Sequence, residues 1–246
     1  MSIAVHPTPD LSTTRRKRAA EIEYPTSDGK PMAETDVHRN LMFDHIAMWE
    51  VRYEHDPNVY VSGNNFIYYQ EGDITKSISP DVYYVSGVPK KERDTYKVWE
   101  EGGIAPSIAF EFTSRSTRQD DQVKKFRIYE QELKTKELVF FDPTGDYLKP
   151  PLQGHRLENG RYVRMELKNG RLYSEVLGLE IVPDGKNLRL YDPVKAEWLI
   201  TPREQRLRAD NEARRAEMEA AARKAADAEN ERLRAELESL RRSMQP

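Results

Sequence analysis

The 246-residue sequence contains no cysteine, which excludes disulfide bonds and metal sites built on thiolates. A chain without disulfides fits a reducing compartment, so we expect a cytoplasmic protein. No apolar run approaches the roughly 20 residues that span a bilayer, and the N-terminus lacks the apolar segment of a secretory signal. We therefore expect no membrane partner, and either one large domain or two small ones.

A strong positive charge is also missing. The 39 Lys and Arg residues against 42 Asp and Glu residues give a net charge of −3. This balance offers no global electrostatic argument for nucleic-acid binding, although a locally basic surface remains compatible with it. Residues 1–30 are rich in Pro, Thr, Ser and charge, and they predict a disordered N-terminal tail.

The C-terminal part lacks glycine and proline between residues 203 and 245. Residues 203–246 contain eleven basic and ten acidic side chains, which predicts a long, solvated, charged helix. A heptad register runs through Leu233, Leu237 and Leu240, but its apolar seam fades after about one heptad. We therefore regard the end of this helix as a candidate coiled coil.

Strands are predicted by short segments rich in aromatic and β-branched residues, bounded by Gly, Asn, Asp and Ser. A helical pattern precedes them over residues 34–54. Two Asn-Gly dipeptides, at 159–160 and 169–170, predict hairpins. Residues 86–105 show no such pattern and predict a long polar connection. The predicted strands are 59–63, 65–70, 80–85, 108–113, 136–147, the two hairpins, and a final pair within 187–201.

A helical segment separates the strands at 108–113 and 136–147, and such a crossover favours parallel pairing. We therefore predict an α/β (α+β) fold with a central mixed sheet flanked by helices. This domain should span residues 31–202 and include a β-rich extension. The long helix at 203–246 follows it.

The stretch IAFEFTSRSTRQDDQVKKFRIYEQ, residues 108–131, carries the most chemistry. Its strand alternates apolar residues on one face with Glu111 on the other. The helical segment that follows places Asp121, Lys125 and Tyr129 four residues apart, on one face. Carboxylate, ammonium and phenol side chains are thereby predicted on neighbouring elements.

A second carboxylate, Asp81, opens the apolar strand after Pro80. Neighbouring strands lie about 4.8 Å apart, so Asp81 and Glu111 at matched heights can share one divalent cation. Such a cation polarises phosphate and activates bound water, and a nearby ammonium stabilises developing negative charge. The combination suits phosphodiester hydrolysis.

Each residue also has a structural interpretation that the spacing leaves open. Glu111 would then lie on a solvated strand face and Asp81 in a turn beside proline. Lys125 would be solvated, and Tyr129 would belong to the core.

The sequence also resembles the Uma-two family of restriction-endonuclease-like proteins, within the PD-(D/E)XK nuclease superfamily. The resemblance covers roughly residues 33–202, and it implies a restriction-endonuclease-like core for the predicted α/β (α+β) fold. Several motifs match in order and with similar spacing, namely ETDVHRNLMFDHI, YVSGNNFIYYQEGD, SPDVYYVSGVPK, YKVWEEGG, FEFTSRSTRQDD, KKFRIYE, FFDPTGDYLKPPLQG and LRLYDP.

The resemblance implies catalytic roles for specific residues. Asp81 is the acid of the PD motif and Glu111 the acid of the second motif. With the carbonyl of Phe112, they would bind Mg²⁺ or Mn²⁺. The superfamily's usual lysine position is occupied here by Thr113, and the Uma-two pattern instead takes its lysine from the following helix, at Lys125.

Supporting residues are implied in the same way. Tyr129 follows Lys125 by one turn, and Asp121 would orient the lysine. The rival lysine is Lys124, which points about 100° away around the helix. We assign no chemical role to three hydroxyl residues of the loop after the catalytic strand, namely Ser114, Ser116 and Thr117.

Glu34 and His38 lie four residues apart near the start of the first helix. Glu34 would assist the metal or simply favour the helix dipole, as an acid in that position does. For His38 we weigh a general base against a packed, hydrogen-bonded histidine, and we favour packing.

We therefore expect a metal-dependent DNA endonuclease. A homodimer would place two sites on the two strands of a duplex. The alternative is a catalytically inactive nuclease-fold protein that acts as a binding or scaffold module. A hydrolase of other phosphoesters is a third, weaker option.

Overall fold

The computed structural model describes residues 22–27, 29, 35–113 and 119–244, with side chains undescribed at 119–122. Most of the predicted tail 1–30 lies outside the described residues. Residues 22–27 contradict the prediction of disorder, because Tyr24 packs against the folded domain. Its ring lies 5.0 Å from Tyr68 and 5.2 Å from Trp99, and its hydroxyl accepts a 2.8 Å hydrogen bond from the Gly72 amide.

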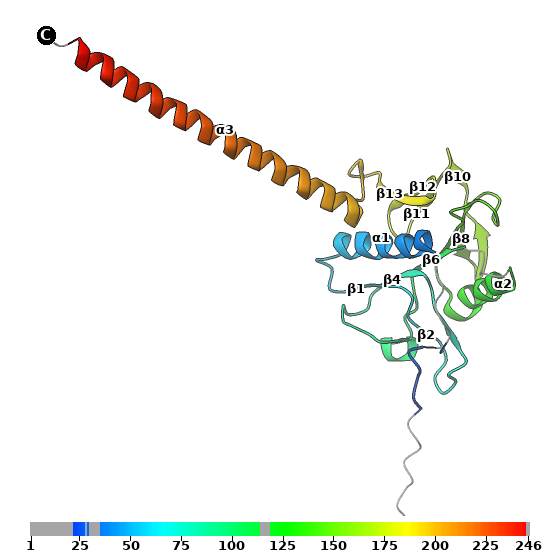
Figure 1. Cartoon of the computed structure of the whole chain (residues 1–246). Helices are drawn as coiled ribbons and strands as arrows, with labels where there is room; N and C mark the ends of the chain where they lie inside the picture. The colour runs from blue at the N-terminus through cyan, green and yellow to red at the C-terminus, as the bar shows by residue number, and fades with distance from the viewer. Residues whose placement is uncertain (1–21, 28, 30–34, 114–118, 245–246) are drawn as a thin grey trace, which may run out of the picture.

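The fold is a mixed α/β architecture built on a six-stranded sheet in the order β1-β4-β6-β7-β8-β9. The pair β6 and β7 is parallel, and the other neighbours are antiparallel. The predicted mixed sheet and crossover are therefore confirmed (Figure 1). The strands are β1 (Val59–Ser62), β4 (Val82–Ser86), β6 (Ile108–Phe112), β7 (Glu137–Phe141), β8 (Leu152–Glu158) and β9 (Arg161–Arg164).

Both faces of this sheet are covered, so all five residues of β6 are buried. Helix α1 (Asp36–Arg52), capped by Thr35, packs Trp49 against Phe110 on one face. On the other face, helix α2 (Gln119–Arg127) continues as the π-helix η2 (Ile128–Leu133). There Tyr129 packs in a cluster that includes Ala109. Burial on both faces excludes the solvated position considered for Glu111, whose residue is 5% exposed.

The β-rich extension is a five-stranded antiparallel sheet, as expected from the hairpin signals. The Asn159-Gly160 turn joins β8 and β9 of the central sheet, and the Asn169-Gly170 turn lies in the extension. Both turns have positive φ at each residue, as type I′ hairpins require. An ion pair of 2.7 Å between Arg52 and Asp192 ties α1 to this sheet. Its strands are β10 (Leu167–Lys168), β11 (Arg171–Ser174), β12 (Leu179–Asp184), β13 (Asn187–Asp192) and β14 (Glu197–Trp198).

A small third sheet corrects two predictions. It consists of β2 (Ile67–Tyr68), β3 (Ser77–Ile78) and β5 (Tyr96–Lys97). The predicted strand 65–70 is thus only two residues long. The predicted polar connection 86–105 contains β5 and the 3₁₀-helix η1 (Val98–Glu101).

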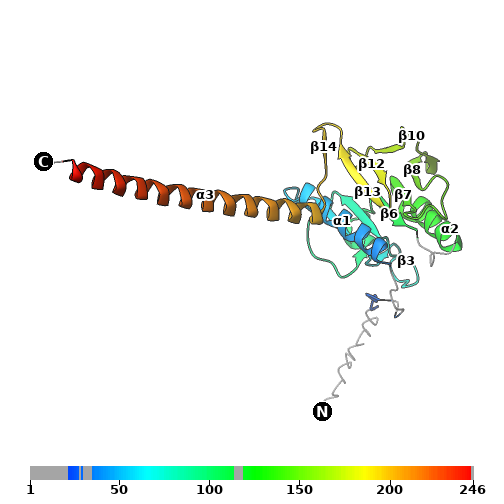
Figure 2. The same ribbon diagram turned by 45° about the horizontal axis from the view of Figure 1, so that its top comes forward.

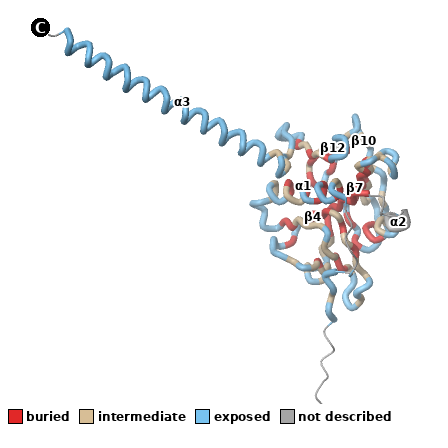
Figure 3. Tube along the Cα trace, in the orientation of Figure 1, coloured by how far each residue is buried: buried red, intermediate tan, exposed pale blue. Residues whose placement is uncertain are grey.

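The long helix α3 (Pro202–Ser243) extends away from the domain (Figure 2). Its 42 residues correspond to a length of about 60 Å. Thr201 and Glu204 form a capping box at its start, and Arg189 of β13 contacts Glu204 at 2.8 Å. None of its residues is buried, as the pale blue tube in Figure 3 shows. Within the described residues, no helix combines the length and apolarity required to cross a membrane.

Candidate active site

Asp81 immediately precedes β4, and Glu111 lies on the neighbouring antiparallel strand β6. Val82 of β4 pairs with Phe110 of β6. One residue further toward the same end of the sheet lie Asp81, beside Val82, and Glu111, beside Phe110. The Phe112 amide donates a 2.6 Å hydrogen bond to Oδ2 of Asp81. This bond fixes the Asp81 carboxylate beside Phe112, the last residue of β6.

A close backbone approach supports this position. The Asn64 amide donates to the Pro80 carbonyl at 2.8 Å, so the chain leaving β1 passes directly against residues 80 and 81. Gly63 permits this contact, because a Cβ atom there would lie 2.1 Å from the Asp81 carbonyl oxygen. Any side chain at residue 63 would therefore displace the segment that carries Asp81.

Glu111 is buried and held from two sides. The Lys125 ammonium donates to its Oε2 at 2.6 Å, and the Tyr129 hydroxyl donates to its Oε1 at 2.6 Å. The two donors lie four residues apart and so share one helix face. Lys125 also donates to the Ser79 carbonyl at 3.1 Å, which links the helix to the segment just before Asp81.

The electrostatics of Glu111 reflect its burial. Loss of solvation raises its pKa from 4.5 to about 7, although the Lys125 charge opposes this rise and the Asp81 charge adds to it. The pKa of Tyr129 lies well above its usual value, first because of burial and then because of the Glu111 charge. Tyr129 is therefore a neutral donor, and a metal cation beside Glu111 would favour its charged form, as the Lys125 ammonium does.

His38 faces the other carboxylate. Its Nε2 lies 3.3 Å from Oδ1 of Asp81. The buried ring meets Phe112 edge to face, with centroids 6.0 Å apart. The structure thus combines the packed histidine that we favoured with a polar contact to the candidate metal ligand.

A small cavity of about 30 Å³ joins these groups, close to the volume of one water molecule. Its donor set fits a hard divalent cation, since Mg²⁺ in proteins is commonly bound by one or two carboxylates and keeps several waters. No cluster of three or more His, Asp or Glu side chains suited to a metal occurs among the described residues. Backbone and water ligands would therefore complete the shell. The cavity is lined by His38, Asp81, Glu111, Phe112, Thr113, Lys125 and Phe140.

The remaining predicted residues lie elsewhere or outside the description. Lys124 is exposed, whereas Lys125 contacts Glu111. The Thr113 hydroxyl donates to the Phe141 carbonyl at 3.4 Å and supplies no ammonium. Asp121 belongs to α2, but its side chain is not described. Glu34 and the loop residues Ser114, Ser116 and Thr117 lie outside the described residues.

Two contributors were not found by sequence reasoning. Gly63 stands in an ordinary Ser-Gly-Asn turn signal, which predicts a turn without predicting a contact with Asp81. Ser79 contributes only its backbone carbonyl to Lys125, so its residue type carries no signal.

Comparison with known proteins decides the family. A family with the description "Putative restriction endonuclease", Uma2, matches residues 11–190. The chain belongs to the Uma2 family. The resemblance drawn from the motifs is therefore confirmed, although the matched region begins earlier than residue 33 and ends before residue 202. Membership in Uma2 points to a nuclease.

Similar proteins add little beyond this assignment. A search of curated proteins found no match. One solved structure is titled as a "putative nuclease belonging to DUF820" from Anabaena variabilis ATCC 29413. It is 15% identical, covers 73% of this chain and 87% of its own, and aligns with a TM-score of 0.42.

Proposed function

We propose that this Uma2 protein is a metal-dependent endonuclease that hydrolyses DNA phosphodiester bonds. The supporting observation is that Asp81, Glu111 and Lys125 line one small cavity at a sheet edge. Two carboxylates and one ammonium around one cavity are the groups that a phosphodiester hydrolase needs. The catalytic residues of the proposal are these three.

In this proposal Asp81, Glu111 and the Phe112 carbonyl hold Mg²⁺ or Mn²⁺. When bound, the cation would polarise the phosphate and activate a water molecule. The hydrogen bond from the Phe112 amide keeps Asp81 at the cavity. Tyr129 keeps Glu111 oriented toward it and does not itself titrate near neutral pH.

Lys125 supplies the positive charge. Its ammonium is a quarter exposed, lies 2.6 Å from Glu111 and lines the cavity. There it stabilises negative charge that develops on the phosphate during attack. Asp121 would orient Lys125, Glu34 would assist the cation, and His38 would hold the second oxygen of Asp81.

A catalytically inactive binding or scaffold module is the second candidate. One observation favours it: both oxygens of Glu111 accept hydrogen bonds from within the chain. A carboxylate satisfied in this way is also a stable structural element. Hydrolysis of another phosphoester would use the same groups on a different substrate.

Nicking of supercoiled plasmid separates these candidates. We expect the wild-type chain to nick plasmid with Mg²⁺ or Mn²⁺ and to stop when EDTA is added. Asp81→Asn should lose the activity, whereas Asp146→Asn, at a residue in an exposed loop, should keep it. Absence of metal-dependent nicking, together with retained plasmid binding, would support the scaffold instead.

The proposal includes a homodimer joined by α3, because cutting both strands of a duplex calls for two sites. In one heptad register, Asn230, Leu237 and Met244 occupy a positions and Leu233 and Leu240 occupy d positions. An Asn at one a position is a device that fixes register and strand number in parallel dimers.

The flanking charges favour a second copy in parallel. Glu229 and Glu236 fall at g, and Arg234 and Arg241 fall at e of the following heptads. In a parallel, in-register pair each g glutamate faces the e arginine of the partner helix. We accordingly divide the chain into a nuclease domain, 31–202, and a dimerisation helix, 203–246. We also propose that the protein is cytoplasmic.

A further inference from the structure

A second and larger cavity, of about 530 Å³, lies beside α2. Lys125 and Tyr129 point to Glu111, and their immediate successors Phe126 and Glu130 line this cavity. Phe140 of β7 lines both the large cavity and the small one. The two cavities are therefore neighbours on the same face of the central sheet.

The inner wall of the large cavity is aromatic. Phe126 meets His155 edge to face, with centroids 5.1 Å apart, and Phe140 meets the same ring at 6.0 Å. Burial lowers the pKa of His155 to about 4, so its ring is neutral at pH 7 and behaves as an aromatic surface. Flat rings and apolar edges of this kind suit a planar ligand.

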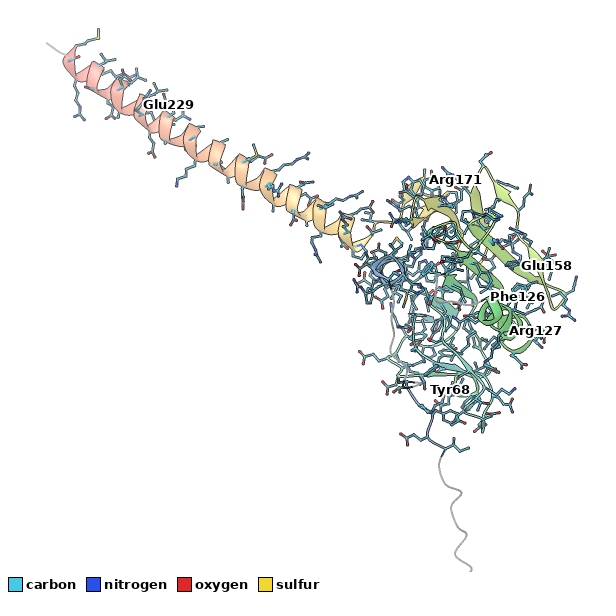
Figure 4. All side chains as sticks on the ribbon, turned by 45° about the vertical axis from the view of Figure 1, so that its right-hand side comes forward. Tyr68, Phe126, Arg127, Glu158, Arg171 and Glu229 are labelled. Atoms are coloured by element: carbon cyan, nitrogen blue, oxygen red, sulfur yellow. The ribbon has the colours of Figure 1, made fainter. Side chains whose placement is uncertain are left out.

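The rim is polar and locally positive. Arg127 and Arg161 are exposed, and Arg127 follows Phe126 on α2 (Figure 4). The carboxylate of Glu130 offsets one of these two charges, through a 3.2 Å contact with Arg161. One net positive charge remains at the cavity, in a chain whose total charge is −3. Gln153 adds a side-chain amide whose nitrogen donates to the Pro150 carbonyl at 3.1 Å and whose oxygen is of the acceptor type that pairs with a base edge.

We propose that this cavity binds one unstacked nucleobase of the DNA strand whose phosphate lies at Glu111. The inference rests on the proposed function and names its substrate class. A cavity of this volume is in the range of small-ligand sites, and the guanidinium rim matches the phosphates on either side of a base. Phe140, shared by both cavities, connects the base site to the scissile phosphate.

A base inside a duplex is stacked and paired, so it reaches such a cavity only after extrusion. Single-stranded DNA needs no extrusion. The enzyme therefore acts best where a strand is already unpaired next to the phosphate that is cut. The sequence preference at that one nucleotide would come from the amide of Gln153, because the Glu130 carboxylate already accepts from the Tyr162 amide and from Arg161.

Fluorescence anisotropy with labelled oligonucleotides tests this site in the full-length chain. Ca²⁺ replaces Mg²⁺ to allow binding without cleavage. We expect a single strand to bind more tightly than a duplex of the same sequence. Gln153→Ala and Phe126→Leu should each weaken single-strand binding roughly fivefold to tenfold, within the range for losing part of one stacked base.

The matched control is Gln205→Ala, at an exposed residue of α3, which should bind as the wild type does. An oligonucleotide with one abasic position provides the complementary measurement. The abasic position should weaken binding to the wild type and add little to the defect of Phe126→Leu. Equal affinity for single strand and duplex would overturn the proposal, as would Gln153→Ala and Phe126→Leu both matching the control.

Failure of this site and failure of the proposed function give different results. If the wild type cleaves plasmid but the cavity variants bind and cleave normally, only the base site is wrong. If no metal-dependent cleavage occurs while single-strand binding still depends on Phe126 and Gln153, the base site is supported and the proposed hydrolysis is refuted.

Discussion

The Tyr129 hydroxyl and the Lys125 ammonium bind the two oxygens of one carboxylate, that of Glu111, each at 2.6 Å. Both donors come from one continuous helical segment, whose α-helix becomes a π-helix just before Tyr129. π-Helical turns are rare and are often found at functional sites. The arrangement holds Glu111 in place before any cation binds.

The two adjacent lysines provide a matched pair for testing the catalytic role. Lys125→Ala removes the ammonium at Glu111 and should lower plasmid nicking by about 10²- to 10³-fold, the usual effect of removing one group that stabilises a transition state. Lys124→Ala removes an exposed charge and should have little effect. Loss of activity in Lys124→Ala, with survival in Lys125→Ala, would assign the role to the other lysine.

Divalent cations should stabilise the folded chain. Binding to the folded state alone adds about 2.7 kcal/mol when the cation is present at 100 times its Kd. The melting temperature should therefore rise with millimolar Mg²⁺ or Mn²⁺, and this rise should vanish in Asp81→Asn and Glu111→Gln. Asp146→Asn is the control, and a wild-type melting curve indifferent to these cations would refute the metal site.

Without a cation, Glu111 should make stability depend on pH. Burial raises its folded-state pKa to about 7, above the unfolded value near 4.5, so the folded state binds the proton more tightly. The contribution of Glu111 to stability is full below about pH 4.5 and is lost as pH rises toward 7 and above. Subtracting the wild-type stability from that of Glu111→Gln removes the contribution of the other titrating groups. This difference should favour the variant more at pH 8 than at pH 5, as measured by thermal melts in EDTA.

The predicted dimer depends on the end of α3. Leu237→Arg places a charge at an a position and should shift the chain from dimer to monomer in sedimentation analysis. Leu207→Arg makes the same change at an exposed residue outside the a and d positions, so it should remain dimeric. A wild-type chain that is monomeric at high concentration would exclude this interface.

Strong local signals made much of the fold predictable. The Asn-Gly turns adopt the positive φ angles that these residues tolerate, and the crossover helix made β6 and β7 parallel. Two strands of the third sheet, β3 and β5, were missed, because so short a strand shows no alternation. They are held instead by pairing with β2, which lies within the predicted strand 65–70.

Residue types predicted which side chains meet in the candidate site, but not their environment. Asp81, Glu111 and Lys125 could be proposed from order and spacing, aided by the family resemblance. The burial of Glu111 could not be predicted, because alternation alone does not tell whether the second face of a strand is covered. The role of Tyr129 depends on that burial, since a hydroxyl in contact with a solvated carboxylate would contribute little.

The contact between Gly63 and the Asp81 carbonyl extends the vulnerable part of the site beyond its charged residues. A single methyl group at residue 63 would overlap a backbone oxygen, which cannot rotate out of the way as a side chain can. We therefore expect substitutions at this glycine to be disfavoured by shape. In a random-mutation screen for inactive proteins, residue 63 should appear beside the acids and the lysine, although it carries no reactive atom.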